Sequence, residues 1–543
     1  MTSSAASSIP NSESLCPAPS TTIDNPILRG SNPDPSIVRV GDDYYIATST
    51  FEWFPGVRIH HSRDLVHWRL LGHVLTRTSQ VDLRGNPRSG GVWAPCLSHD
   101  GERFWLVYTD VKAWGHGFVD AHNYLVTAPS IEGPWTDPIY LNSSGFDPSM
   151  FHDEDGRKWV VNMCWDHRPG RHPFAGILLQ EYDHARGILV GEPRTIFRGS
   201  TLGRTEGPHL YRRGSWLYLV CAEGGTSWEH AVTVARATNI EGPYELAPHH
   251  PLLTAEGRPS VALQKSGHGS LVQTQNEEWY LAHLCARPAL PSRRCVLGRE
   301  TALQRIEWDA EGWPRLLGGG NKPSTQLSAP KLSPHPFPAE PACETFDAPV
   351  LPAHFQTLRV PSDPSWLSLV DRPGYLRLRG RESPQSLHRH SLVARRITEL
   401  DFEARTTLEV RPRSFQQLAG LMCWYDDQNW AYLAVTHDEN LGRCLTLLVA
   451  ELGACRELLD ASVPLPDDPR IGLRVRARSG QLRWQWSTGS VWQPLPAVFD
   501  LTQLSDEHTT LGMGFTGAFV GMCAHDMTGD SLVADFDDFE YQA

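Results

Sequence analysis

A short motif recurs five times in the first half of the chain, each time with a polar or aromatic residue close to proline or glycine. We call each copy an opening, because an aromatic-rich run follows it. The openings are centred on Asp34, Trp93, Asp147, Glu206 and His268, which lie 59, 54, 59 and 62 residues apart, and an aromatic-rich apolar run follows each one ten to twelve residues later. A repeat of this length holds four short strands and their loops, and such repetition is typical of a β-propeller. The sequence therefore predicts a five-bladed β-propeller whose five openings meet at one mouth of the central channel.

The apolar pattern divides the chain into four stretches. Residues 1–22 are rich in Ser and lack an apolar run, so we expect a disordered N-terminal tail. Residues 23–320 carry short apolar runs bounded by Gly, Pro, Asp or Asn, which is the pattern of propeller strands. Residues 321–342 are rich in proline and are predicted to be an extended linker.

Residues 343–543 show a different sequence pattern, with longer runs in which apolar and polar residues alternate. This alternation predicts a β-sandwich in which each sheet has one solvated face. The expected strands include Tyr375–Arg379, Phe402–Val410, Trp430–Val435, Ile471–Ala477 and Phe536–Tyr541. The predicted fold class is thus all-β, a five-bladed propeller followed by a β-sandwich.

Composition excludes several classes of function. A formal net charge of −13 and a pI near 6.0 argue against binding to nucleic acid or to an anionic membrane, because both call for a clustered basic face. The 11 cysteines include no CxxC pair, so neither a disulfide framework nor a zinc knuckle is indicated. We expect a cytoplasmic protein, or a secreted one if a signal has been removed, because neither a signal peptide nor a membrane-spanning run is visible.

Three of the five openings carry a carboxylate, namely Asp34, Asp147 and Glu206. An Asp before Pro is also a common turn starter, so each one alone would indicate only a turn. Their occurrence at one phase of the repeat instead predicts a shared site. Three acids at a propeller mouth are compatible with a metal site, a sugar-cleaving site or a lectin-like pocket.

Aromatic residues near the openings favour a sugar over a metal. Phe51 follows the first aromatic run, Trp93 occupies the second opening, and Trp165 lies just past the third run. The apolar faces of sugars stack on such rings while acids contact the hydroxyl groups. We therefore predict that these three side chains contact a bound saccharide.

Taken in order, the motifs resemble those of glycoside hydrolase family 43, in its β-xylosidase branch with an appended β-sandwich. The matching stretches are Asn25–Gly30 running into Ser31–Ser36, Gly91–Pro95, Phe146–Ser149, Thr205–His209, Gly267–Ser270 and Leu297–Thr301. The resemblance covers nearly the whole chain after Thr22 and implies a sandwich of the concanavalin or jelly-roll type. It also implies an exo-acting, inverting hydrolase that releases D-xylose from the non-reducing end of β-1,4-xylooligosaccharides, with α-L-arabinofuranosidase side activity.

The resemblance also implies roles for the three acids. Asp34 would be the general base, Glu206 the general acid, and Asp147 the carboxylate that raises the pKa of the acid and orients it. In an inverting enzyme the base and the acid stand roughly 6.5 to 9.5 Å apart, with a water between the base and the anomeric carbon.

Three further residues receive implied roles in substrate binding. Arg299 would bind substrate hydroxyls or Asp147, and His268 would help to hold the site at the centre of the channel. His268 would also lie near a structural Ca²⁺ held through water, although no cofactor is required for the reaction. Phe519, in the loop Gly517–Met522, would close one side of the pocket. The resemblance also implies a homo-oligomer, a dimer or a tetramer.

Alternatives remain open at this point. The main activity could be that of an arabinofuranosidase, because the two pentoses present similar hydroxyl patterns. A retaining, fructosidase-like hydrolase would use its first Asp as a nucleophile, about 5 to 5.5 Å from its partner. A catalytically inactive sugar-binding propeller would keep the pocket and lack the reaction.

Overall fold

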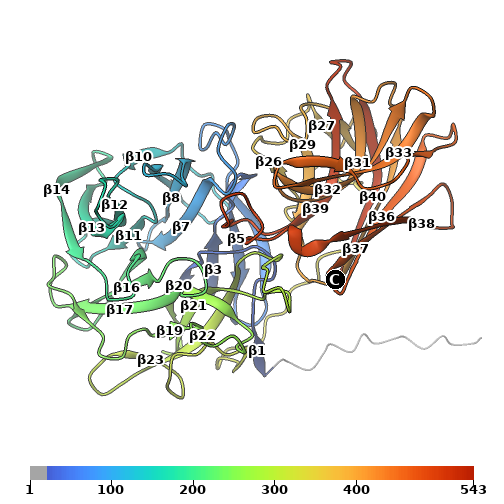
Figure 1. The fold of residues 1–543 in the computed structure, drawn as a ribbon. Helices are drawn as coiled ribbons and strands as arrows, with labels where there is room; N and C mark the ends of the chain where they lie inside the picture. Colours follow the sequence, from blue (N-terminus) through green and yellow to red (C-terminus); the bar gives the residue numbers. More distant parts are fainter. Residues whose placement is uncertain (1–20) are drawn as a thin grey trace, which may run out of the picture.

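The computed structural model describes residues 21–543, and Figure 1 shows them as two β domains side by side. Within this range the one helix is the 3₁₀ turn η1 (Leu501–Gln503), so the all-β prediction is confirmed. The predicted tail lies outside the described residues except for its last two, and Thr22 belongs to strand β1 (Thr22–Asp24).

The N-terminal domain is a propeller of five antiparallel blades. Blades 1 and 2 consist of β2 (Ser36–Val40), β3 (Asp43–Thr48), β5 (Gly56–Ser62) and β6 (Arg69–Leu75), and of β7 (Gly91–His99), β8 (Phe104–Ala113), β9 (Asp120–Ala128) and β10 (Ile139–Asn142). Blade 3 consists of β11 (Ser149–His152), β12 (Lys158–Trp165), β13 (Phe174–Asp183) and β14 (Ile188–Phe197). Blades 4 and 5 consist of β15 (Glu206–Arg213), β16 (Trp216–Glu223), β17 (Ala231–Ala237), β18 (Glu245–Leu246) and β19 (Leu253–Thr254), and of β20 (Gln264–Gln273), β21 (Trp279–Ala286), β22 (Glu300–Trp308) and β23 (Pro314–Leu316).

The first strand of each blade lines the channel, and these strands contact one another around a closed ring in the order β2, β7, β11, β15 and β20. A separate cluster of buried apolar side chains fills each gap between neighbouring blades. Representative members of the five clusters are Leu97, Val160, Leu219, Leu271 and Ile37. Radial repetition therefore buries both faces of every blade, as the aromatic-rich runs predicted.

Each inner strand has a residue with left-handed backbone dihedrals, either within the strand or two positions before it. The five residues are Asp34 (φ 57°), Ala94 (φ 34°), Asp147 (φ 55°), Gly207 (φ 55°) and His268 (φ 48°). In β7, β15 and β20 this residue lies in a bulge, where the inner strand has one residue more than its neighbour. Bulges of this kind redirect a side chain and are common beside active sites.

The true repeat therefore differs from the predicted one in two blades. Ala94 and Gly207, and not Trp93 and Glu206, are equivalent to Asp34. The predicted repeat matched residues by the type of their side chain, whereas the structure matches them by their left-handed backbone conformation. In blades 2 and 4 the functional residue comes one position before the left-handed residue.

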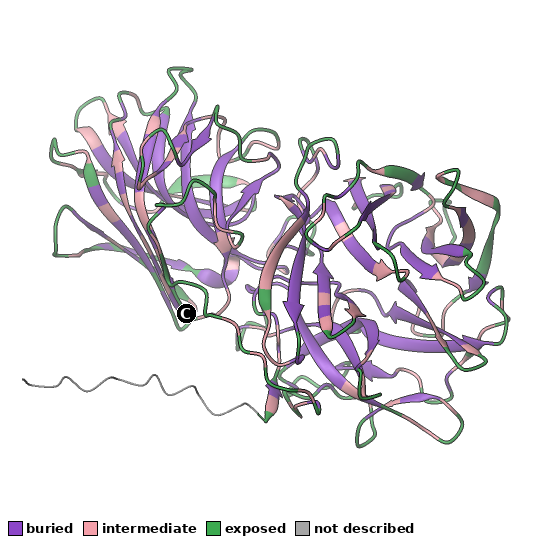
Figure 2. Cartoon of the chain, turned by 180° about the vertical axis from the view of Figure 1, so that it is seen from behind, coloured by how far each residue is buried: buried purple, intermediate pink, exposed green. Residues whose placement is uncertain are grey.

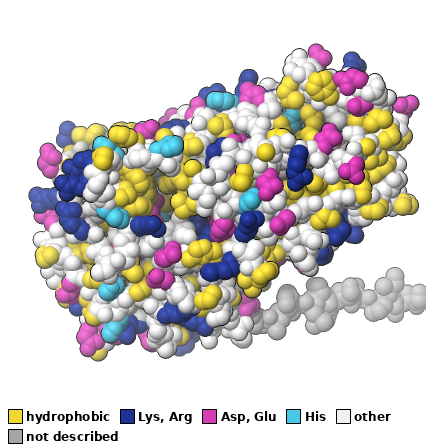
Figure 3. Space-filling view, in the orientation of Figure 1, with side chains coloured by type: hydrophobic (Ala, Val, Ile, Leu, Met, Phe, Trp, Pro, Cys, Tyr) yellow, Lys and Arg dark blue, Asp and Glu magenta, His cyan; other side chains and the backbone are white. Residues whose placement is uncertain are grey.

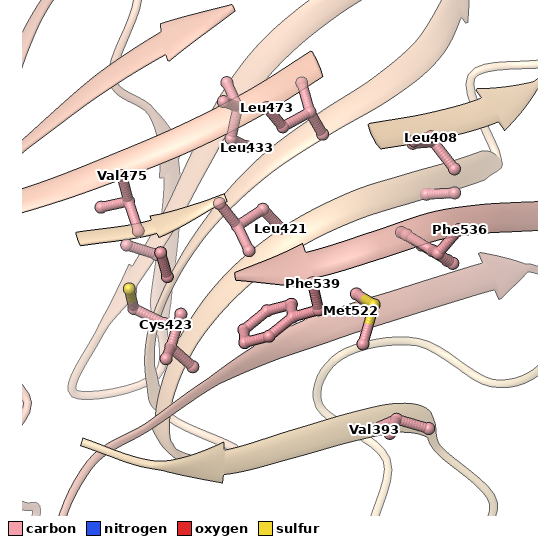
Figure 4. Close-up of a cluster of buried hydrophobic side chains, with 14 of the residues drawn as sticks. Val393, Leu408, Leu421, Cys423, Leu433, Leu473, Val475, Met522, Phe536 and Phe539 are labelled. Atoms are coloured by element: carbon pink, nitrogen blue, oxygen red, sulfur yellow. The ribbon is translucent and has the colours of Figure 1, made fainter. Parts of the chain in front are cut away.

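The C-terminal domain is a sandwich of two large antiparallel sheets. One sheet consists of β25 (Cys343–Glu344), β27 (Leu367–Ser368), β28 (Leu376–Arg379), β40 (Val533–Gln542), β30 (Phe402–Val410), β36 (Arg470–Arg478), β37 (Gln481–Ser487) and β38 (Gln493–Asp500). The other consists of β34 (Ala454–Glu457), β35 (Val463–Pro464), β33 (Gly442–Glu451), β32 (Asn429–Asp438), β31 (Gln417–Asp426), β39 (Phe519–Asp526), β29 (Ser391–Arg396), β26 (Gln356–Leu358) and β4 (Trp53–Phe54). Leu421, Leu473 and Phe536 meet between the two sheets in Figure 4.

The prediction of one solvated face per sheet is right for one sheet and wrong for the other. Along β30 buried and half-buried residues alternate, whereas every residue of β31 is buried. Figure 2 shows this continuous burial where the second sheet approaches the propeller. The second face of this sheet carries its own apolar cluster, which includes Trp424 and Tyr432 and which Trp53 of the propeller joins.

The two domains share backbone hydrogen bonding and an aromatic stack. Strand β4 leaves blade 1 and pairs with β26 at the edge of the nine-stranded sheet. The ring of Trp53 stacks on that of Phe519 at 3.8 Å between centroids, and both side chains are fully buried. The junction is thus built like a domain core.

The predicted linker also contains structure. Within it, β24 (Gln326–Ser328) pairs with β1, which lies just ahead of the first blade. The following proline-rich residues run along blade 1, where the guanidinium of Arg69 lies 4.7 Å from the centre of the Phe337 ring.

Acidic, basic and hydrophobic side chains are interspersed over both domains on the face shown in Figure 3. In residues 21–543 no helix is long and apolar enough to cross a membrane.

The strain at the left-handed positions can be measured at Ala94. Ala94→Gly and Ala47→Gly each remove one buried methyl group, but only position 94 has a left-handed backbone. Because glycine relieves that strain, we expect Ala94→Gly to cost about 1 kcal/mol less free energy of unfolding than Ala47→Gly. Urea denaturation of both variants measures the difference, and equal losses would contradict a strained bulge.

Candidate active site

A cavity of about 420 Å³ opens at one mouth of the propeller channel. This volume lies within the range of about 300 to 1,000 Å³ that is usual for small-molecule sites. All five predicted opening residues line it, namely Asp34, Trp93, Asp147, Glu206 and His268. The structure thus brings together side chains that are up to 234 positions apart in the sequence.

Asp34 is held by three neighbours at the base of the cavity. Its Oδ2 accepts a hydrogen bond from the Ser49 hydroxyl at 2.6 Å, and its Oδ1 lies 3.1 Å from Nη1 of Arg299. Nδ1 of His268 is 3.7 Å from the same Oδ1. Burial by itself would raise the pKa of Asp34, but Arg299, His268 and Ser49 outweigh it and lower the pKa below the ordinary value. Asp34 is therefore ionised.

Asp147 and Glu206 have the opposite electrostatic environment. Asp147 accepts a hydrogen bond from the backbone N–H of Gly207 at 3.1 Å, while Glu206 begins the next inner strand. Burial raises the pKa of both groups; the charge of Asp34 raises both further, and the charge of Asp147 adds to the rise at Glu206. The pKa of Glu206 lies well above its ordinary value, which favours its protonated form.

A buried hydrogen-bond network holds the segment that leads into Glu206. The carboxylate of Glu223, which is fully buried, accepts hydrogen bonds from the hydroxyls of Thr205 at 2.8 Å and of Thr233 at 2.7 Å. It also accepts one from the backbone N–H of Ser200 at 2.7 Å. Because Thr205 directly precedes Glu206, this network restricts where the acid can lie.

Aromatic rings form the walls of the cavity. The predicted Phe51, Trp93 and Trp165 line it, and so do Trp114, Phe146 and Phe174, which the sequence analysis had not assigned to the site. The indole N–H groups of Trp93 and Trp165 donate to the carbonyls of Ser89 and Gly117, so the rings present apolar faces to the cavity. Such walls suit the C–H faces of a sugar.

The sandwich supplies a further wall, but not through the predicted residue. Phe519 does not line the cavity, because its ring is packed between Trp53 and the guanidinium of Arg396 at the domain junction. Phe515 and Met513 line the cavity instead. These residues precede β39 in a loop, where the chain can reach over the propeller, whereas Phe519 is already a strand residue.

Phe515 is fixed to the propeller by its own backbone. Its N–H donates to the hydroxyl of Ser89 at 3.0 Å, and its ring lies 5.5 Å from Trp93 and 4.9 Å from Trp114 between centroids. No sequence pattern marked this residue, because its position depends on how the two domains dock.

Arg299 was expected to bind substrate hydroxyls or Asp147. In the structure Nη1 of Arg299 forms its ion pair with Asp34 and donates to the hydroxyl of Thr226 at 2.7 Å. Thr226 and Arg204 also line the cavity and were not predicted. Arg299 is therefore shared between the ionised carboxylate and the cavity wall.

The structural Ca²⁺ expected near His268, held through water, stays a prediction. Ca²⁺ takes six to eight oxygen ligands. Asp34 is the one described carboxylate that pairs with His268, and the ring of His209 lies 6.3 Å away between centroids. Among residues 21–543 no group of three or more His, Cys, Asp or Glu side chains is arranged to hold a metal ion.

The cavity thus combines one ionised carboxylate, Asp34, with two buried carboxyl groups whose pKa values are raised, Asp147 and Glu206. Two acids with pKa values driven apart by their surroundings are the arrangement that general acid and general base catalysis requires. With aromatic walls around them, these groups can act on a neutral, hydroxyl-rich molecule.

Comparison with known proteins shows close similarity over both domains. Residues 23–314 match the family described as Glycosyl hydrolases family 43, and residues 343–542 match the Beta xylosidase C-terminal Concanavalin A-like domain. A Beta-xylosidase of Bacillus subtilis (strain 168) is 48% identical over 531 residues, which is 96% of this chain and 99% of the relative. The Xylosidase/arabinosidase 43B of Humicola insolens is 48% identical over 95% of this chain and 97% of its own length.

A solved structure agrees with the fold. The crystal structure of xylan beta-1,4-xylosidase from Bacillus halodurans C-125 superposes with a TM-score of 0.95 at 55% sequence identity, covering 96% of this chain and all of that one.

The clustering of acids predicts a pH-dependent gain in stability for Asp147→Asn. Asparagine tolerates the left-handed backbone and can keep the hydrogen bond from Gly207. Because burial raises the pKa of Asp147 to about 8, the wild-type protein loses stability as the pH rises from about 4 to 8, and the variant is spared this loss.

We therefore expect the free energy of unfolding of Asp147→Asn, relative to wild type, to rise by on the order of 2 kcal/mol between pH 5 and pH 8. Urea denaturation at both pH values measures it, with Asp42→Asn, whose side chain is 65% exposed, as the control. A difference that does not change with pH would contradict the clustering.

Proposed function

The chain belongs to glycoside hydrolase family 43, and we propose that it is an exo-acting, inverting β-D-xylosidase. It releases D-xylose from the non-reducing end of β-1,4-xylooligosaccharides. The observation that carries this proposal is the pair of oppositely tuned carboxyl groups, Asp34 and Glu206, in one aromatic cavity.

Membership of the family supports a single-displacement reaction. Ionised Asp34 takes a proton from a water molecule, which attacks the anomeric carbon as the glycosidic bond breaks. Protonated Glu206 donates its proton to the departing glycosidic oxygen, so that no alkoxide forms. After the reaction Asp34 is protonated and Glu206 is ionised, and exchange with solvent restores both.

Asp147 supports the reaction through charge. Burial raises the pKa of Glu206, and the negative charge of Asp147 raises it further. The Gly207 N–H that binds Asp147 belongs to the residue directly after Glu206. The same contact therefore sets the position of both acids.

The shape of the site supports cleavage at chain ends. Phe515 and Met513 bring the sandwich domain over one side of the cavity, which favours a pocket over an open groove. A pocket accepts the terminal sugar of a chain, whereas a groove would admit its interior. We propose that the aromatic walls hold the terminal xylose and that Arg299 and Thr226 contact its hydroxyl groups.

A side activity on α-L-arabinofuranosides is part of the proposal. The two pentoses expose similar hydroxyl patterns, and the double name of the Humicola insolens relative supports this reading. Arabinofuranosidase as the main activity is the nearest alternative. The assembly of the chain into dimers or tetramers and its cytoplasmic location stay predictions.

The stereochemistry of the first product tests the roles of Asp34 and Glu206. Proton NMR of a fresh digest of xylobiose should show α-xylose as the first-formed product, followed by slow mutarotation. An inverting reaction converts the β linkage into an α hemiacetal. If β-xylose formed first, the reaction would be retaining and Asp34 would be a nucleophile.

The acid role of Glu206 is tested by Glu206→Gln, which keeps the shape of the side chain and cannot donate a carboxyl proton. We expect kcat/KM on xylobiose to fall by about 10² to 10⁴, and to fall far less on an aryl xyloside with a good leaving group. The exposed Glu241 provides the control Glu241→Gln, which should behave like wild type. Equal losses on both substrates would exclude the acid role.

A further inference from the structure

Arg396, the last residue of β29 in the sandwich, reaches across the domain junction to the segment that carries Asp34. Its Nε donates a hydrogen bond to the backbone carbonyl of Ser31, three residues before Asp34. Its Nη1 donates to the side-chain carbonyl of Gln356. Arg396 is 5% exposed, so both contacts lie in the interior.

A second buried arginine, Arg58 of blade 1, binds the next residue of the same segment. Nη1 of Arg58 lies 2.9 Å from Oδ1 of Asn32, and the side-chain N–H groups of Asn32 donate back to the carbonyls of Arg29 and Gly30. One arginine from each domain therefore holds consecutive residues, Ser31 and Asn32, both of which are buried.

Neither arginine has a carboxylate partner. Among the described residues Arg58 and Arg396 form no ion pair, although each is less than a tenth exposed. Burial lowers the pKa of both guanidinium groups, and the charge of Arg58 lowers the pKa of Arg396 further, whereas the carboxylate of Glu340 acts on Arg58 in the opposite direction. A buried cation without an ion pair is costly, so the contacts of Arg396 suit a role other than stabilising the fold.

The path from Ser31 to the carboxylate is short and fully hydrogen-bonded. The N–H of Asn32 donates to the carbonyl of Arg299 at 2.9 Å, and the N–H of Ser49 donates to the carbonyl of Pro33 at 3.1 Å. Arg299 and Ser49 are the same two residues that bind the oxygens of Asp34. A shift of Ser31 would therefore move Asp34 relative to both of its partners.

The other hydrogen bond of Arg396 leads through Gln356 to a second segment of the propeller. Gln356, fully buried, donates from Nε2 to the carbonyl of Pro55 at 2.8 Å, just past the turn that carries Phe51. The guanidinium of Arg396 also lies 5.0 Å from the centre of the Phe519 ring. The planar group thus joins two segments of the propeller to the sandwich.

We propose that Arg396 is a positioning residue that sets, from the sandwich domain, the place of Asp34 in the propeller. The inference rests on the proposed role of Asp34 as the general base. Arg396 touches neither substrate nor reacting atoms. It acts through the carbonyl of Ser31, and Arg58 supports the same segment from within the propeller.

A positioning role for Arg396 and a role only in docking the two domains predict different kinetic effects. If Arg396 positions the base, its loss lowers kcat and leaves KM nearly unchanged, because the aromatic walls that bind the sugar stay in place. If Arg396 merely holds the domains together, its loss displaces Phe515 from the cavity, and KM rises. The split between kcat and KM therefore separates the two roles.

The experiment compares Arg396→Met, Arg396→Lys and Arg395→Met on xylobiose. Arg395 is the matched control, because it belongs to the same strand and pairs with Glu340 at 2.9 Å without touching the Ser31 segment. For Arg396→Met we expect a fall in kcat of about 10- to 100-fold, the size that a small misplacement of a catalytic group produces. Arg395→Met should keep the wild-type kcat.

If Arg396→Met does not fold, Arg396→Lys tests whether Arg396 positions Asp34. A single ammonium cannot reproduce the planar fork that reaches Ser31 and Gln356 together, so kcat should fall in the same direction by a smaller factor. In both variants the acid limb of the pH profile of kcat should move to higher pH, because a displaced Asp34 loses contacts that lower its pKa.

A wild-type kcat and pH profile in folded Arg396→Lys, or a rise in KM with unchanged kcat, would overturn the inference. Asp34→Asn distinguishes this failure from failure of the proposed function. An inactive Asp34→Asn beside a fully active Arg396 variant would refute only the positioning role. An active Asp34→Asn would refute the base assignment on which it rests.

Discussion

A left-handed residue in or just before each inner strand is the constraint on which the site depends. In three blades it lies in a bulge, and bulges redirect side chains beside active sites. Non-glycine residues adopt this conformation at a cost of about 1 to 2 kcal/mol each, and aspartate tolerates it better than most. Two of the five positions are aspartates, Asp34 and Asp147, and both are proposed to work in the reaction.

The second constraint is electrostatic. Three carboxyl groups share one water-poor cavity, and Arg299 is the guanidinium that pairs with one of them. Because Arg299, His268 and Ser49 contact Asp34, the pKa of that acid stays low, while burial and the charge of Asp34 raise the pKa values of Asp147 and Glu206. The unequal contacts of the three acids therefore separate one ionised carboxylate from two groups that favour their protonated form.

The sandwich is part of the site and not an appendage. It shares strand pairing with blade 1 through β4, packs Phe519 on Trp53, and sends Phe515 into the cavity. The segment that ends at Arg299 also enters the sandwich core, because Val296 and Leu297 pack in its main cluster. Arg299 thus owes its position to both domains, as Asp34 does through the segment that Arg396 and Arg58 hold.

The sequence by itself determined the architecture, the five openings and the identity of the three acids, because repeat length and alternation are local properties. Asp34, Asp147, Glu206, Trp93 and His268 were predicted to converge, and they line one cavity. Only the tertiary structure decided that Phe515 and not Phe519 faces the cavity and that Arg299 pairs with Asp34 and not with Asp147. It also decided the register of the bulges in blades 2 and 4. These outcomes depend on how the two domains dock and on where the backbone adopts left-handed dihedrals. Neither the docking nor these dihedrals produce a periodic pattern in the amino-acid sequence.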